Sequence, residues 1–195
     1  MKRRPAPAVR IFAGLWKRRL LEVPDGSRPT SGRAREALFS IVQKRIPGAR
    51  VLDLYAGSGA VGIEAVSRGA ARAVLVEKDA RILRKNLARL PPVQEGEILV
   101  LEEDAARALT RLASSGVRFD LVFADPPYGE AQEAFHSTAA DVLSPAGILV
   151  LQADRFEEAP SVGRLALLER REYGRNVFFF FGRDATVRVS GRSAL

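Results

Sequence analysis

The chain has 195 residues, of which 47% are hydrophobic and none is cysteine. This length is typical of one domain, and the lack of cysteine excludes disulfide bonds and thiolate metal sites. Lys and Arg exceed Asp and Glu by eight, and residues 1–35 carry this whole excess with ten basic and two acidic side chains. A basic segment on a neutral body is typical of proteins that bind a polyanion, and a solvated tail is the alternative.

No apolar run is long enough to cross a bilayer. Charged residues interrupt the region after the basic N-terminus, which argues against a signal peptide. We therefore expect a cytoplasmic protein that makes no membrane contact.

The N-terminal region predicts two short extended pieces, at residues 9–12 and 20–23, which would form a hairpin around Gly14. A turn is expected at Pro24-Asp25-Gly26. Thr30 or Ser31 is suited to cap a helix from about residue 33 to residue 44.

From residue 50 onward, short apolar runs alternate with helical segments, which predicts a parallel sheet with helices on both faces. The expected strands are 50–54, 73–77, 97–101, 119–124 and 148–152, and the expected helices end near 67 or span 79–90, 104–112 and about 129–143. The two-residue link Gly174-Arg175 predicts an antiparallel hairpin of 164–173 and 176–182, with Phe178 to Phe181 as its buried strand.

These elements predict an α/β, Rossmann-like fold whose seven-stranded, mostly parallel sheet ends in an antiparallel hairpin. We expect three parts: a basic hairpin and helix at 1–45 that is suited to a polyanion, a main domain at 46–190 that holds the sheet, and a flexible tail at 191–195.

The glycine-rich turn Gly57-Ser58-Gly59-Ala60-Val61-Gly62 follows the first strand of the sheet. With Glu77 twenty residues on, it matches the dinucleotide fingerprint, so that NAD is one candidate ligand. Asp53, however, would repel a pyrophosphate and suits a ligand with a cationic amino-acid end. Asp104, after the third strand, could bond an adenine amine or simply cap a helix.

The stretch Val51 to Gly59 resembles the S-adenosylmethionine loop of class I methyltransferases. The resemblance implies S-adenosyl-L-methionine as cofactor and a methyltransferase form of the predicted fold. The contacts it implies are Asp53, Tyr55, Ala56, Gly57, Ser58, Gly59, Glu77, Lys78, Asp104 and Ala105.

Asp125-Pro126-Pro127-Tyr128 directly follows the fourth strand. An exocyclic base amine is a poor nucleophile because its lone pair is delocalised into the ring. The carboxylate of Asp125 and the carbonyl of Pro126 could accept its two N–H groups and aim the lone pair at the methyl group. Pro127 would stiffen the loop and Tyr128 could stack on the base. An ordinary turn is the alternative, although the tetrapeptide resembles the signature of amino-methyltransferases.

Residues 28–39 and 10–17 resemble the matching segments of bacterial 16S rRNA (guanine(966)-N(2))-methyltransferases, and the likeness extends over about residues 9 to 182. It implies methylation of a guanine N2 in 16S rRNA by a monomer, within a small ribosomal subunit or an assembly intermediate. It also implies that Thr30, Arg33 and Glu36 lie at the cofactor mouth, with Phe39 beside the cofactor.

The expected RNA contacts are Arg10, Lys17, Arg18, Arg19, Arg28 and Arg35. Trp16 is either a stacking platform for RNA or the core of the N-terminal hairpin; the latter is favoured. No metal constellation is visible in the sequence, and methyl transfer from a sulfonium needs none.

Three other functions are compatible with parts of the sequence. The glycine fingerprint alone would suit an NAD-linked oxidoreductase, and the basic segment alone would suit a non-enzymatic RNA-binding module. An amino-methyltransferase of another rRNA base or of DNA would share every motif, although the chain is short for a DNA enzyme with its own target-recognition domain.

Overall fold

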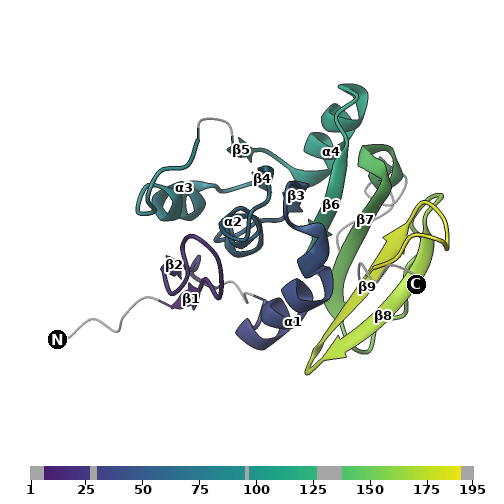
Figure 1. Cartoon of the computed structure of the whole chain (residues 1–195), viewed down its shortest axis with the longest axis horizontal. Coiled ribbons are helices and arrows are strands. Elements are labelled where there is room, and N and C mark those ends of the chain that lie inside the picture. The colour runs from purple at the N-terminus through teal and green to yellow at the C-terminus, as the bar shows by residue number, and fades with distance from the viewer. Residues whose placement is uncertain (1–6, 27–29, 95–96, 127–137, 190–195) are drawn as a thin grey trace.

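A computed structural model describes residues 7–26, 30–94, 97–126 and 138–189. Within these residues the chain forms one large sheet with helices on both faces and a small hairpin at its side (Figure 1). The large sheet has seven strands: β3 (Arg50–Leu54), β4 (Arg72–Glu77), β5 (Ile98–Glu102), β6 (Phe119–Ala124), β7 (Leu143–Asp154), β8 (Ala166–Tyr173) and β9 (Asn176–Gly182).

The spatial order of the strands is β5-β4-β3-β6-β7-β9-β8. The first five strands in this order, β5, β4, β3, β6 and β7, pair in parallel. Strand β9 pairs antiparallel with both β7 and β8. The order reverses direction between β3 and β6, and this is where open α/β sheets bind their ligands. The predicted fold class is therefore confirmed, including the antiparallel hairpin that ends the sheet.

Two of the described helices begin with a side-chain cap. The described helices are α1 (Gly32–Val42) with the 3₁₀ turn η1 (Gln43–Arg45), α2 (Ala60–Ser67), α3 (Arg81–Leu87), α4 (Ala105–Ser114) and the 3₁₀ turn η2 (Ala139–Val142). The Ser31 hydroxyl accepts the backbone N–H of Ala34 at 3.2 Å and so caps α1. No helix among the described residues is long and apolar enough to cross a membrane.

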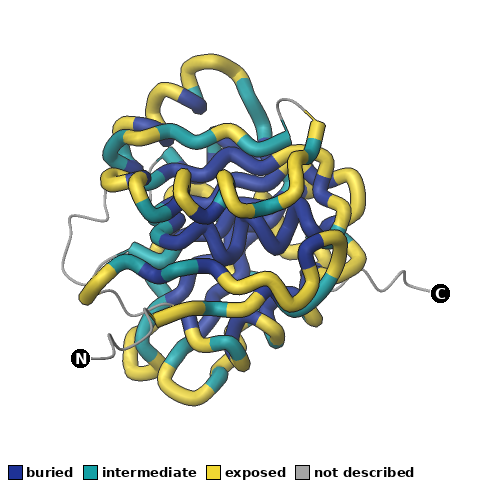
Figure 2. Tube along the Cα trace, turned by 90° about the vertical axis from the view of Figure 1, so that its left-hand side faces the viewer, coloured by how far each residue is buried: buried dark blue, intermediate teal, exposed yellow. Residues whose placement is uncertain are grey.

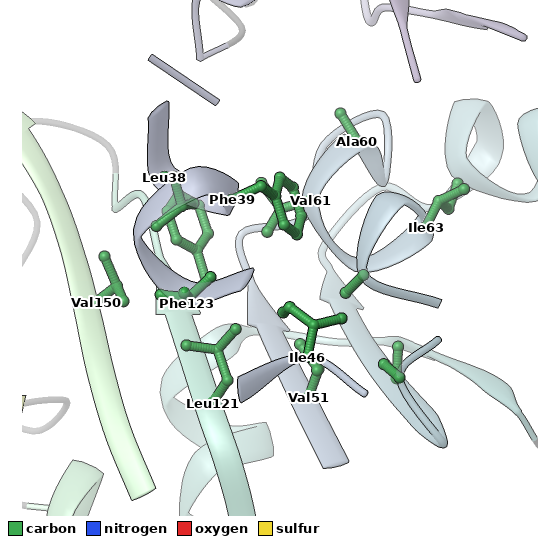
Figure 3. Packing of buried hydrophobic residues seen from close by; sticks show 14 of the residues in the cluster. Leu38, Phe39, Ile46, Val51, Ala60, Val61, Ile63, Leu121, Phe123 and Val150 are labelled. Atoms are coloured by element: carbon green, nitrogen blue, oxygen red, sulfur yellow. The ribbon is translucent and has the colours of Figure 1, made fainter. Parts of the chain in front are cut away.

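Successive side chains of a strand point to opposite faces of the sheet, and this divides the core into two layers. Phe178 and Phe180 face the layer formed with α1, α2 and α3, and Phe179 and Phe181 face the layer formed with α4 and η2. Figure 3 shows part of the first layer, to which Leu38, Phe39 and Phe123 belong. The buried residues run through the centre of the molecule (Figure 2). Four consecutive phenylalanines are thus explained by a strand that is covered on both faces.

The N-terminal residues form a separate antiparallel pair, β1 (Ala8–Arg10) and β2 (Leu20–Glu22), beside α1 and α2 (Figure 1). Its loop docks on the end of α2, where the backbone N–H of Leu15 bonds to the Ser67 carbonyl at 2.7 Å. Gly14 has φ +82°, and a Cβ there would lie 1.6 Å from the same carbonyl oxygen. Trp16 is 2% exposed and its Nε1 donates to the Pro91 carbonyl at 3.2 Å, so that it belongs to the core.

Some element boundaries differ from the prediction. Strand β7 begins at Leu143, because residues 143–147, whose Ser-Pro-Ala-Gly resembles a turn, continue the strand across a register shift opposite Phe119 and Leu121. The helix α3 is shorter than expected. The helix predicted after residue 128 falls largely outside the described residues, and the predicted tail at 191–195 lies wholly outside them.

Candidate functional site

A cavity of about 640 Å³ opens at the edge of the sheet where the parallel strands end. The residues that follow β3, β4, β5 and β6 line it, and residues from the end of the N-terminal hairpin complete its wall. Ligand sites of open parallel sheets lie at this edge. The topology therefore brings together side chains that are about seventy residues apart in the sequence, such as Asp53 and Asp125.

The glycine-rich loop is held by carboxylates behind it. The backbone N–H of Gly57 donates to Glu77 Oε2 at 2.7 Å, and that of Gly62 donates to Asp53 Oδ2 at 2.8 Å. Gly59 has φ +81°, and a Cβ there would come within 2.4 Å of the Leu83 side chain. Tyr55 has φ +61°, a conformation that is uncommon outside glycine and concentrates at functional sites.

Asp53 is almost completely buried, with 1% of its surface exposed. Burial raises its pKa to about 7, the Gly62 hydrogen bond opposes the shift, and the carboxyl groups of Asp125 and Glu77 add to it. A cationic group of a ligand placed here would stabilise the charged form of Asp53.

Asp104 both caps a helix and lines the cavity. Its Oδ1 accepts the backbone N–H groups of Ala106 at 3.0 Å and Arg107 at 3.2 Å, which fulfils the N-cap alternative. The residue also belongs to the cavity wall.

Asp125 follows β6 and lies at the same cavity, together with Pro126. Its Oδ2 accepts hydrogen bonds from Gln152 Nε2 at 2.8 Å and from the Thr30 hydroxyl at 3.4 Å. Burial raises the pKa of Asp125 to about 7, although both hydrogen bonds favour the charged form. The other two members of the predicted clamp, Pro127 and Tyr128, lie outside the described residues.

Most of the residues predicted from the sequence to bind the cofactor line this one cavity. They are Thr30, Asp53, Tyr55, Ala56, Gly57, Ser58, Glu77, Lys78, Asp104 and Ala105. Gly59 packs under the loop instead. Arg33 and Glu36 lie exposed on α1, outside the cavity lining. Phe39 is wholly buried in the core, and the guanidinium carbon of Arg68 lies 4.5 Å from the centre of the Phe39 ring. The predicted place of Phe39 beside a cofactor is therefore wrong.

The prediction that Arg35 contacts RNA is also wrong. Its side chain is 1% exposed and pairs with the buried carboxylate of Glu64 at 3.2 Å. It also donates to the Arg10 carbonyl at 2.5 Å and lies over the Phe12 ring. Arg35 therefore ties the N-terminal hairpin to α2, because its guanidinium bonds to the Arg10 carbonyl on one side and to the Glu64 carboxylate on the other.

The other predicted RNA contacts form an exposed group. Arg10 and the three hairpin residues Lys17, Arg18 and Arg19 are exposed, and Arg28 lies outside the described residues. The residues that directly follow the hairpin, beginning with Val23, line the cavity. The exposed cations of the hairpin therefore precede part of the cavity wall in the sequence.

Two features of the site were missed from the sequence. The predicted turn at Pro24-Asp25-Gly26 contributes Pro24 and Gly26 to the cavity wall, although its sequence indicates only a turn. Gln152 bonds to Asp125, but nothing in the pattern of its strand distinguishes it from any polar residue near a strand end.

Comparison with known proteins gives concordant results. The profile of a family described as "Conserved hypothetical protein 95" matches residues 9–182. "Ribosomal RNA small subunit methyltransferase D" of Escherichia coli is 41% identical over 122 residues, which are 62% of this chain and 60% of that protein's length. "Putative rRNA methyltransferase YlbH" of Bacillus subtilis is 34% identical over 175 residues, or 85% of this chain and 94% of that one.

A solved structure shares the fold over nearly the whole chain. It is described as "Putative methyltransferase yhhF from Escherichia coli", with a TM-score of 0.78 and 34% identity. The match covers 92% of this chain and 100% of that one.

Proposed function

Since the chain belongs to the conserved hypothetical protein 95 family, we propose that it methylates the N2 amine of a guanine in small-subunit ribosomal RNA, using S-adenosylmethionine. The observation that carries the proposal is the position of Asp125 and Pro126 at the same cavity as the glycine-rich loop. A group that can hold an amine and a loop that can hold a methyl donor thus meet at one edge of the sheet.

The cavity is suited to the cofactor in the chemistry of its wall. Asp53 and Glu77 offer carboxylates to an amino group and to ribose hydroxyls, and Asp104 offers one to an adenine amine. The acids that line this cavity disfavour a dinucleotide, because its pyrophosphate would face like charge. When bound, the cofactor would supply a methyl group activated by a positively charged sulfur.

The role proposed for Asp125 is to accept one N–H of the amine, while the carbonyl of Pro126 accepts the other. Both acceptors orient the nitrogen lone pair, and placing it in line accounts for much of the rate of such a reaction. The buried environment strengthens these hydrogen bonds, since water competes poorly there.

The exposed cations of the N-terminal hairpin would bind the phosphates that flank the target guanine. The relatives named for ribosomal RNA support this substrate class. We further propose that the protein acts in the cytoplasm as a monomer, on a small ribosomal subunit or an assembly intermediate, with residues 1–45 as its RNA-binding part and residues 46–190 as its catalytic part.

The test is transfer of labelled methyl groups from S-adenosylmethionine to naked small-subunit RNA, to small subunits lacking the modification, and to DNA. The modified nucleoside is then identified by mass spectrometry. N2-methylguanosine in RNA is the expected product. A product methylated on adenine or cytosine, or transfer to DNA alone, would contradict the proposal.

A further inference from the structure

Gln152 lies directly behind the proposed amine clamp. It belongs to β7, whose Leu151 is paired with Ala124, the last residue of β6. Gln152 and Asp125 are the next residues of the two parallel chain segments and therefore lie side by side. Its Nε2 donates to Asp125 Oδ2 at 2.8 Å. Gln152 is 6% exposed and is not among the described residues that line the cavity. Its hydrogen bond to Asp125 therefore connects it to a residue that does line the cavity.

The surroundings of Gln152 are otherwise apolar. The preceding residues Leu149, Val150 and Leu151 are buried, and its partner across the antiparallel pair is Phe178. Its Oε1 is buried and accepts no hydrogen bond from the residues that the structure describes. A buried acceptor without a donor lowers stability, whereas an apolar side chain of similar size would avoid this loss. The amide is thus costly for folding, and its one described polar contact is with Asp125.

Resting on the proposed function, we infer that Gln152 is a positioning residue that, with Thr30, holds Asp125 Oδ2 so that Oδ1 accepts the substrate amine. Two donors on one oxygen fix the plane of the carboxylate. They also stabilise its charged form, which accepts hydrogen bonds better than the neutral acid. Gln152 would therefore set both the direction and the charge of the clamp.

The groups that face Asp125 sharpen this role. From β3 comes the carboxyl of Asp53, which interacts with Asp125 and, in turn, with Glu77 at the end of β4. From the segment before α1 comes the Thr30 hydroxyl, and from β7 the Gln152 amide. For Asp125, burial favours the neutral carboxyl, and the two donors oppose it. Removing the closer donor should raise the pKa of Asp125 further.

The test uses the full chain and the variant Gln152→Met, which keeps the size of the side chain and removes the donor. Methyl transfer to small-subunit RNA is measured from pH 6 to pH 9.5 with saturating cofactor. We expect the rising limb of the profile to move upward by about one pH unit, so that the rate near pH 6.5 falls about tenfold and recovers near pH 9. We also expect an unchanged or higher thermal midpoint, and a cofactor Kd within about twofold of the parent.

An equal loss of rate at every pH, or a profile that does not move, would overturn the inference. If Gln152→Met does not fold, Gln152→Asn withdraws the amide from Asp125 and is measured in the same way, with the same two outcomes. A parent protein that transfers no methyl group to small-subunit RNA would overturn the proposed function instead. The two failures are therefore separate.

Discussion

The guanidinium of Arg35 and the carboxylate of Glu64 form an ion pair at 3.2 Å with 1% and 0% of their side chains exposed. Arg35 lies in α1 and Glu64 in α2, and Arg68, which directly follows α2, bonds to the same carboxylate. Since Arg35 also holds the Arg10 carbonyl, this cluster joins the N-terminal hairpin to the helix whose first turn forms the cavity wall.

Replacing Arg35 should therefore destabilise the whole protein. We expect Arg35→Met to lower the free energy of unfolding by about 3 kcal/mol, toward the lower end for breaking a buried pair because Arg68 still accompanies Glu64. Urea denaturation measures the change. Arg33→Met, exposed on the same helix, is the matched control and should change the free energy by no more than about 0.5 kcal/mol. Equal effects of the two variants would contradict the role given to the pair.

Asn86 makes a second connection between hairpin and cavity. Its buried side chain accepts the backbone N–H of Glu22 at 2.8 Å and donates to the carbonyls of Glu22 at 2.8 Å and Ser58 at 3.0 Å. We expect Asn86→Ala to cost at least about 2 kcal/mol, since it leaves three backbone groups unpaired, and to weaken cofactor binding through the Ser58 loop. Unfolding and calorimetric titration measure the two effects. Lys85→Ala, which removes only an exposed ion pair, should leave both nearly unchanged.

How far the sequence predicts this structure depends on the range of the interactions involved. The strands and the order of the helices follow from local apolar patterns, and the glycine-rich loop and Asp125 follow from motifs of a few residues. Most of the predicted cofactor residues line one cavity for this reason. The start of β7 was less well predicted, because its turn-like residues 144–147 lie between Leu143 and Ile148, which both pair with β6.

The partners of the site residues were not predictable in the same way. Gln152 bonds a residue 27 positions away, and Asn86 bonds residues 28 and 64 positions away. Arg35 was expected at the surface because arginine is rarely buried. Its partner, the buried carboxylate of Glu64, is brought to it only when α1 and α2 come together in the fold. Such contacts arise from tertiary structure and leave no periodic signal.

Cofactor binding should depend on pH through Asp53. Its pKa of about 7 in the free protein means that it carries a proton over much of the range below neutrality. A cationic amino group beside it would lower that pKa, so that binding releases a proton and becomes tighter as the pH rises toward 7. The apparent affinity should fall by up to about tenfold for each pH unit below the pKa.

Calorimetry at pH 6.5 in buffers with different ionisation enthalpies measures the released protons. Asp53→Asn should bind the cofactor more weakly and lose the proton release. Asp79→Asn, at an exposed carboxyl outside the cavity lining, is the control and should retain it. Proton release that persists in Asp53→Asn would assign it to another group.

Removing the carboxylate of Asp125 should separate chemistry from cofactor binding. Asp125→Ala deletes an acceptor of the amine but leaves the glycine-rich loop and its carboxylates in place. We expect methyl transfer to fall by about a hundredfold or more, because misplacing a reacting group costs this much, while the cofactor Kd stays within a few-fold. Single-turnover rates and titration calorimetry give the two values. Full activity in this variant would reject the clamp.

The exposed cations of the hairpin should determine how RNA binding responds to salt. Lys17, Arg18 and Arg19 are all exposed and lie beyond the buried Trp16 that anchors the loop. Each phosphate contact releases about 0.7 to 0.9 of a counterion, so that replacing all three residues by alanine should lower the slope of log K against log salt by about 2 to 3. The control replaces Arg111, Arg164 and Arg171, three exposed arginines outside the hairpin, and removes the same charge. If the control lowers the slope as much as the hairpin variant, the effect comes from net charge, and the hairpin is not the RNA-binding surface.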